Sequence, residues 1–108
     1  MDQKEAINIS KEFLSYLVES GYKIKEAFLF GSYAKNRFND DSDIDFLYSF
    51  DLNKLPIEEY ADAYFDLLFS LKSLLNREID LISENHLSNK YFISEVNKTK
   101  VLLYESPN

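Results

Sequence analysis

The sequence contains no cysteine and only one histidine. Without cysteine, disulfides and thiolate zinc sites are excluded, and the redox compartment stays open. No unbroken apolar run approaches the roughly 18 residues that a membrane span needs. The first ten residues, MDQKEAINIS, show no basic region followed by an apolar one, so we expect no secretory signal. We therefore expect a cytoplasmic protein that does not contact a membrane.

Basic residues are also scarce. Twelve Lys and Arg stand against nineteen Asp and Glu, which gives a formal net charge of −7. No stripe of Lys and Arg is visible, although nucleic-acid binding usually requires one. We therefore expect no direct nucleic-acid partner. A small anion such as a nucleotide stays compatible with this charge, provided that metal ions offset the repulsion.

What the chain does have is a globular composition in 108 residues, 45% of them apolar, with nine Phe and eight Tyr. This length suits one domain, expected over residues 1–108. The hydrophobic spacing predicts the order helix, strand, strand, helix, strand, helix, strand. The expected elements are a helix ending before Gly21, strands at 24–30 and 43–50, a helix from Pro56 to about 76, a strand at 78–83, a weaker helix at about 89–98 and a strand at 100–106.

This order predicts a small mixed sheet flanked by helices, an α/β or α+β domain. The helix between the second and third strands is long enough for a crossover, which favours parallel pairing of those two strands. Asp40-Asp41-Ser42, in the link between the first two strands, is expected to be a turn.

Three aspartates are expected to lie close together. Asp43 and Asp45 are two residues apart on a predicted strand, so their side chains share one face. Asp80 lies between Ile79 and Leu81 on the next strand and also points away from the apolar face. If those strands are neighbours, the three carboxylates converge in the way that two divalent cations require. The alternative is that they are merely solvated residues at the strand starts.

The pair Gly31-Ser32 follows a buried strand and predicts a tight turn at the start of a helix. Backbone N–H groups and the serine hydroxyl can bind an anion there, and glycine lets a phosphate approach closely. A phosphate turn followed by metal carboxylates would serve one ligand, a nucleoside triphosphate with its Mg²⁺.

The stretch GSYAKNRFNDDSDID, residues 31–45, resembles the signature G-S-x-x-x-G-x-x-x-x-x-S-D-x-D of the DNA polymerase beta-like nucleotidyltransferase superfamily. The sequence of this stretch is most similar to the minimal nucleotidyltransferase (MNT) domains of that superfamily. The resemblance implies the nucleotidyltransferase fold, with ATP as substrate and two Mg²⁺ ions. It also implies that Gly31 and Ser32 hold the triphosphate, that Asp43 and Asp45 ligate both metals, and that Asp80 binds the metal beside the attacking hydroxyl.

The chain departs from the family pattern at one position. Asn36 replaces the second glycine, and Lys35 precedes it where arginine is usual. If that glycine serves a positive φ, asparagine is the next most tolerant residue. If that glycine lets the ligand approach the backbone closely, the side chain of Asn36 obstructs the ligand. Lys35 keeps a charge for the nucleotide but lacks the bidentate fork of arginine.

The family resemblance also implies a partner. Minimal members are similar to antitoxins that bind a HEPN-type toxin and attach AMP to one of its tyrosines. Because the chain ends soon after its last expected strand, we expect another protein to bring the acceptor. The alternatives are a catalytically weak binding module that neutralises its partner by contact, which Asn36 favours, and a small-molecule enzyme of the aminoglycoside type.

A few other residues have plain interpretations. His86 lies in a polar loop and is expected to be solvated. Lys35 and Arg37 either contact phosphates or are simply exposed. The aromatic and leucine residues of the second helix, Tyr60, Tyr64, Phe65, Leu68 and Phe69, are expected in its core. Because the chain has more aromatics than a small core needs, some are candidates for a protein interface.

Overall fold

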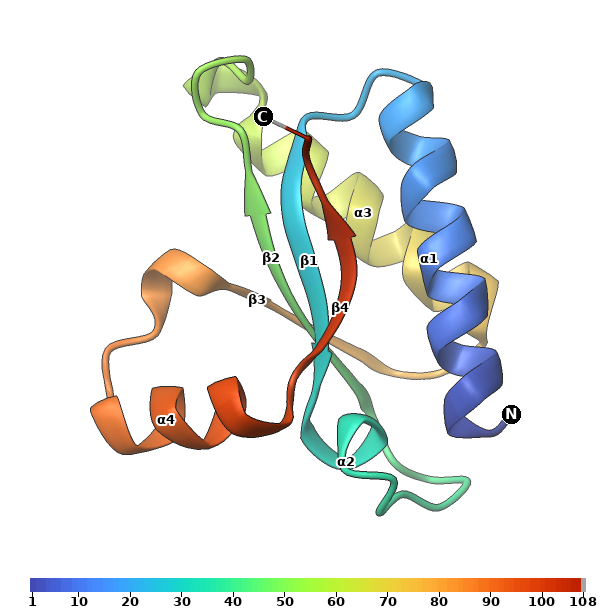
Figure 1. Cartoon of the computed structure of the whole chain (residues 1–108). Helices are drawn as coiled ribbons and strands as arrows, with labels where there is room; N and C mark the ends of the chain where they lie inside the picture. Colours follow the sequence, from blue (N-terminus) through green and yellow to red (C-terminus); the bar gives the residue numbers. More distant parts are fainter. Residues whose placement is uncertain (108) are drawn as a thin grey trace.

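The computed structural model describes residues 1–107. Within them a four-stranded sheet carries helices on both faces (Figure 1). In chain order the elements are α1 (Gln3–Glu19), β1 (Ile24–Phe30), α2 (Gly31–Ala34), β2 (Ile44–Phe50), η1 (Ile57–Glu59), α3 (Tyr60–Leu75), β3 (Ile79–Ser83), η2 (Glu84–His86), α4 (Lys90–Thr99) and β4 (Val101–Glu105), where η marks a 3₁₀ turn. The predicted order is confirmed. The structure adds the 3₁₀ turns and shows that the helix expected after the Gly31-Ser32 turn is the four-residue α2; all three are too short to show a periodic pattern.

The sheet is mixed, and its strands follow the order β3-β2-β1-β4. β1 pairs antiparallel with both β2 and β4, whereas β2 and β3 run parallel. The parallel pair is the one that the crossover through α3 predicts. It also brings the starts of β2 and β3 to the same end of the sheet, where β1 ends.

The helix ends follow from local sequence. α1 begins after Asp2, whose carboxylate accepts a backbone N–H of the first turn at 2.8 Å. It ends before Gly21, whose φ of +105° is typical of a glycine that closes a helix. Pro56 opens a 3₁₀ turn, and α3 itself begins only at Tyr60. No helix in the part of the chain that the structure describes is long and apolar enough to cross a membrane.

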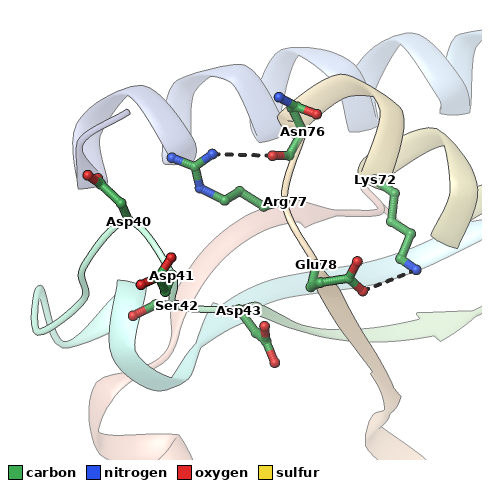
Figure 2. Close-up of a pocket in the computed structure, with 8 residues that line it drawn as sticks. All are labelled: Asp40, Asp41, Ser42, Asp43, Lys72, Asn76, Arg77 and Glu78. Atoms are coloured by element: carbon green, nitrogen blue, oxygen red, sulfur yellow. Dashed lines mark hydrogen bonds and ion pairs between the residues drawn. The ribbon is translucent and has the colours of Figure 1, made fainter.

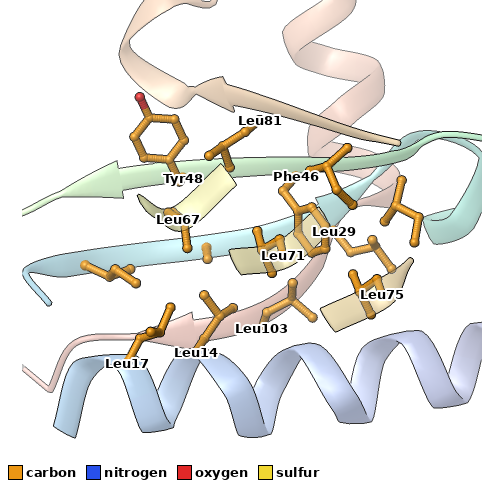
Figure 3. Close-up of a cluster of buried hydrophobic side chains, with 14 of the residues drawn as sticks. Leu14, Leu17, Leu29, Phe46, Tyr48, Leu67, Leu71, Leu75, Leu81 and Leu103 are labelled. Atoms are coloured by element: carbon orange, nitrogen blue, oxygen red, sulfur yellow. The ribbon is translucent and has the colours of Figure 1, made fainter. Parts of the chain in front are cut away.

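The two faces of the sheet are covered unequally. Phe46 of β2 lies in the larger core, on the side of the sheet that α1 and α3 cover (Figure 3), and Ile44 belongs to the same cluster. Leu47 follows Phe46 and points to the opposite face of the sheet, because the side chains of successive strand residues alternate between the two faces. The cluster on that second face consists of Phe28, Phe30, Leu47 and Val96. Val96 belongs to α4, so a single short helix covers the face on which Asp45 also lies.

The expected burial of two aromatic residues in α3 was wrong. Phe65 and Phe69 are 50% and 58% exposed. α3 meets the core through Leu67, Leu71 and Leu75, so the two phenylalanines lie off that line and stack on each other at 5.9 Å. They leave an aromatic surface on the outside of α3.

Candidate active site

β1 runs directly into the turn that opens α2. Gly31 has a φ of +71°, and a Cβ built there would overlap Oδ2 of Asp45. A side chain is therefore excluded both by backbone strain and by lack of space. The predicted tight turn before a helix is confirmed. Because α2 has only four residues, its dipole is small, and an anion here would depend on local N–H groups and the Ser32 hydroxyl.

Asp45 and Asp80 lie side by side on neighbouring strands. They are register partners in the parallel pair of β2 and β3, which places their Cα atoms about 5 Å apart. Burial, a hydrogen bond with Asp80, and the charges of Asp80 and Asp43 raise the pKa of Asp45 to about 7. Asp45 therefore binds a proton more readily than an ordinary carboxylate near neutral pH, and a cation bound between the carboxylates would displace that proton.

Asp43 lies one residue before β2 and is exposed. It is close enough for its charge to raise the pKa of Asp45. Within residues 1–107, however, no group of three or more His, Cys, Asp or Glu side chains is placed to hold a metal ion. The structure thus brings two of the expected carboxylates into contact and leaves the third nearby. The donor chemistry fits a hard cation such as Mg²⁺, since all three groups offer carboxylate oxygens.

Lys35 follows α2 and reaches toward α4. Its Nζ lies 3.7 Å from Oε1 of Glu95, a residue of α4 that is sixty positions away in the sequence. Both side chains are partly exposed. The ammonium group of Lys35, which is predicted to contact phosphates, is therefore close to the Gly31-Ser32 turn and is already paired with the carboxylate of Glu95.

Asn36 has a φ of +56° and is exposed. Of the two readings of the family glycine, the structure matches the one in which the position serves a left-handed backbone. Asparagine tolerates this conformation better than most residues. The bond from the Asn36 N–H to the Tyr33 carbonyl, at 3.2 Å, keeps this turn closed behind α2.

The loop before β2 forms one side of a polar pocket that the sequence did not predict (Figure 2). Its volume is about 400 Å³, and it is lined by Asp40, Asp41, Ser42, Asp43, Lys72, Asn76, Arg77 and Glu78. Lys72 is paired with Glu78 at 3.3 Å, and Nε of Arg77 is buried without a partner. No spacing in the sequence links these residues, because the pocket forms only when the starts of β2 and β3 are aligned.

Two plain interpretations are confirmed. Asp40 and Asp41 lie in a turn, where the Asp41 N–H donates to the Asn39 side chain at 2.8 Å. His86 is exposed in η2. Neither turn nor histidine contributes to the Asp45–Asp80 pair.

A mixed sheet with paired carboxylates beside a glycine-serine turn has the layout of a nucleotidyltransferase. The sequence model of the family described as "Polymerase beta, Nucleotidyltransferase" matches residues 11–108. The chain belongs to this family, and the predicted resemblance is confirmed.

Curated relatives support the same class. Two proteins of Methanocaldococcus jannaschii, both named "Putative protein adenylyltransferase", are 35% identical over 75 residues and 30% identical over 79 residues. The first match covers 69% of this chain and 72% of the relative, and the second covers 73% and 77%.

Solved structures show the same fold. One described as "Structure of putative minimal nucleotidyltransferase" is 24% identical, with a TM-score of 0.69 over 94% of this chain and 95% of that one. Another, "Crystal structure of the toxin-antitoxin with AMP-PNP", is 22% identical, with a TM-score of 0.63 over 91% and 74%. A third contains a tri-AMPylated Shewanella oneidensis HEPN toxin in complex with an MNT antitoxin; it is 23% identical, with a TM-score of 0.55 over 96% and 73%.

Proposed function

We propose that this nucleotidyltransferase is a protein adenylyltransferase antitoxin that transfers AMP from ATP to a tyrosine of a HEPN-type toxin. The observation that carries the proposal is the Asp45–Asp80 pair beside Gly31, in a chain of this family. The names of the curated relatives support protein as the acceptor class. The toxin complexes among the solved structures of this fold support the partner.

The roles that we propose for the residues are those that the family resemblance implies. Asp43 and Asp45 would hold both metal ions, and Asp80 would hold the one nearer the acceptor. When bound, two Mg²⁺ ions would neutralise the charge of the triphosphate and align the attacking and leaving oxygens. Gly31, Ser32 and Lys35 bind the triphosphate, through the open backbone, the hydroxyl and the ammonium group.

Asp80 takes the proton of the acceptor hydroxyl. The oxygen of that hydroxyl forms a bond to the α-phosphorus of ATP, and the bond from this phosphorus to the bridging oxygen of the β-phosphate breaks. Pyrophosphate leaves, and AMP stays on the acceptor. Burial, the hydrogen bond with Asp80 and the charges of Asp80 and Asp43 raise the pKa of Asp45, so a cation or a proton is favoured at Asp45.

The test is to incubate the protein with ATP, Mg²⁺ and a HEPN-type partner and to record the intact mass of both chains. We expect AMP to be added to the partner, and Asp43→Asn to abolish the addition. Asp41→Asn is the matched control, because it removes the same charge from an exposed residue of the same loop. It should leave the transfer intact.

Asp80→Asn separates binding from chemistry. We expect it to keep nucleotide binding within roughly threefold and to lower transfer by at least about 100-fold, since it removes the proton acceptor. Calorimetry with ATP and the mass assay measure the two quantities. Equal loss of both would contradict the role assigned to Asp80.

A second function is favoured by one observation, the lack of a ready three-carboxylate group within residues 1–107. In that case the chain neutralises its partner by contact alone. The same mass experiment distinguishes the two, because a stable complex with no added AMP would indicate the contact-only module.

A further inference from the structure

α4 carries an exposed aromatic ring next to the candidate active site. Phe92 is 43% exposed. Its ring makes a T-shaped contact with that of Phe30, with centroids 6.1 Å apart and an angle of 76° between the planes. In such a contact Phe30 covers at most one face of the Phe92 ring, and the 43% exposure shows that a large part of this residue is open to solvent.

The position of this ring is fixed by its neighbours. Phe30 immediately precedes Gly31 and is the register partner of Asp45 on β2. Glu95, three residues after Phe92, is ion-paired with Lys35 at 3.7 Å. Residues three apart lie on the same side of a helix, so Phe92 and Glu95 both face the end of the sheet where the Gly-Ser turn lies. Figure 1 shows α4 beside α2 at that end.

We propose that the open face of Phe92 stacks on the base of the bound nucleoside triphosphate. The proposal rests on the function proposed above and names the base-binding part of the same site. Lys35 and the Gly31-Ser32 turn mark where the phosphates lie, and Phe92 is one helical turn along α4 from the residue that Lys35 contacts. One helical turn is about 5.4 Å along the axis, and a nucleoside is long enough to span that length. A flat apolar base is the part of the ligand that a phenyl face can recognise.

The neighbouring Tyr91 does not fit this role. It is 77% exposed, and the ammonium group of Lys90 lies 5.5 Å from the centre of its ring. It makes no ring contact with Phe30, and one residue of helix turns it about 100° away from Phe92. Tyr91 is therefore a matched control, an exposed aromatic on the same helical turn.

The test compares two ligands by calorimetry in the presence of Mg²⁺: ATP, and inorganic tripolyphosphate, which has the phosphates without the base. Phe92→Leu keeps an apolar side chain against Phe30 but removes the aromatic face. We expect it to bind ATP about tenfold more weakly and tripolyphosphate as tightly as the unmodified protein. Tyr91→Leu should change neither ligand. Phe92→Trp keeps an aromatic face and should bind ATP as tightly as the unmodified protein or more tightly.

Four results would overturn the proposal. If Phe92→Leu binds ATP as tightly as the unmodified protein, the base does not stack there, although the proposed function stands. If the variant loses both ligands equally, Phe92 only supports the fold around Lys35. If it keeps both ligands but no longer binds the HEPN-type partner, the ring belongs to a protein interface. Should the unmodified protein bind neither ligand, the proposed function falls as well.

Discussion

The two glycines of the chain both have positive φ values, but for different reasons. At Gly21, with φ +105°, a Cβ would meet nothing within 4 Å. At Gly31, with φ +71°, a Cβ would overlap the carboxylate of Asp45. Gly21 therefore serves only the backbone, whereas Gly31 also makes room for a side chain of the candidate site.

This difference predicts two separable effects of alanine. Gly21→Ala and Gly31→Ala should each lower the free energy of unfolding by about 1–2 kcal/mol, because alanine is strained in this region. Gly31→Ala should in addition displace Asp45 and lower AMP transfer by roughly 100-fold. Urea unfolding and the intact-mass assay measure the two effects.

Gly21→Ala is the control, since it has the strain without the overlap. It should transfer AMP at the normal rate once folded. If both variants lost activity to the same extent, the contact between Gly31 and Asp45 would not matter for the site.

At the scale of the elements, the sequence predicted the pairs that depend on strand geometry. Asp45 and Asp80 could be placed together because a helical crossover makes two strands parallel and a strand alternates its faces. The sequence alone does not decide between a backbone role and ligand contact at position 36, because the φ of a residue in a short turn leaves no periodic signal. The pair Lys35–Glu95 could not be predicted, since it depends on how α4 packs across the sheet. The expected burial of Phe65 was wrong because apolar residues in α3 continue beyond the face that packs against the core.

The sheet also brings acidic groups together at the end opposite the candidate site. Glu84 follows β3, and Glu26 lies on β1. Burial, and then the charge of Glu26, raise the pKa of Glu84 above its ordinary 4.5, while Lys100 partly offsets the rise. The folded state therefore binds this proton more tightly than the unfolded state. Its contribution to stability is complete below pH 4.5 and is lost as the pH rises through the raised pKa.

Glu84→Gln should remove this loss. We expect the variant to be more stable than the unmodified protein at pH 7.5 by about 0.5–1 kcal/mol, with a smaller difference at pH 4. Urea unfolding at both pH values measures this. Glu12→Gln removes the same charge from an exposed position of α1. If it gave the same gain, general charge repulsion in an acidic chain would explain the result, and the Glu26–Glu84 contact would not.

Across the molecule, the helices on the two faces of the sheet bury different numbers of residues. α1 buries Ala6, Ser10, Leu14 and Leu17, and α3 buries Leu67, Leu71 and Leu75. α4 buries only Val96. α4, which carries Phe92 and the Glu95 that pairs with Lys35, thus buries fewer residues than either α1 or α3.

Hydrogen exchange should show this difference directly. Elements with few buried contacts open at lower free energy than the global unfolding, so the amides of α4 should exchange faster than those of α3 in the nucleotide-free protein. The side chain of Asn89 accepts the N–H groups of Tyr91 and Phe92 at 3.0 and 3.1 Å, so opening should involve the whole helix and not only its first turn. Because the bound base and phosphates would contact α4 and the neighbouring turn, ATP with Mg²⁺ should slow exchange in α4 and α2 and leave α3 unchanged. Equal protection of α3 and α4 without nucleotide would mean that the ion pair of Lys35 with Glu95 and the packing of Val96 hold the second face more firmly than their small buried area suggests.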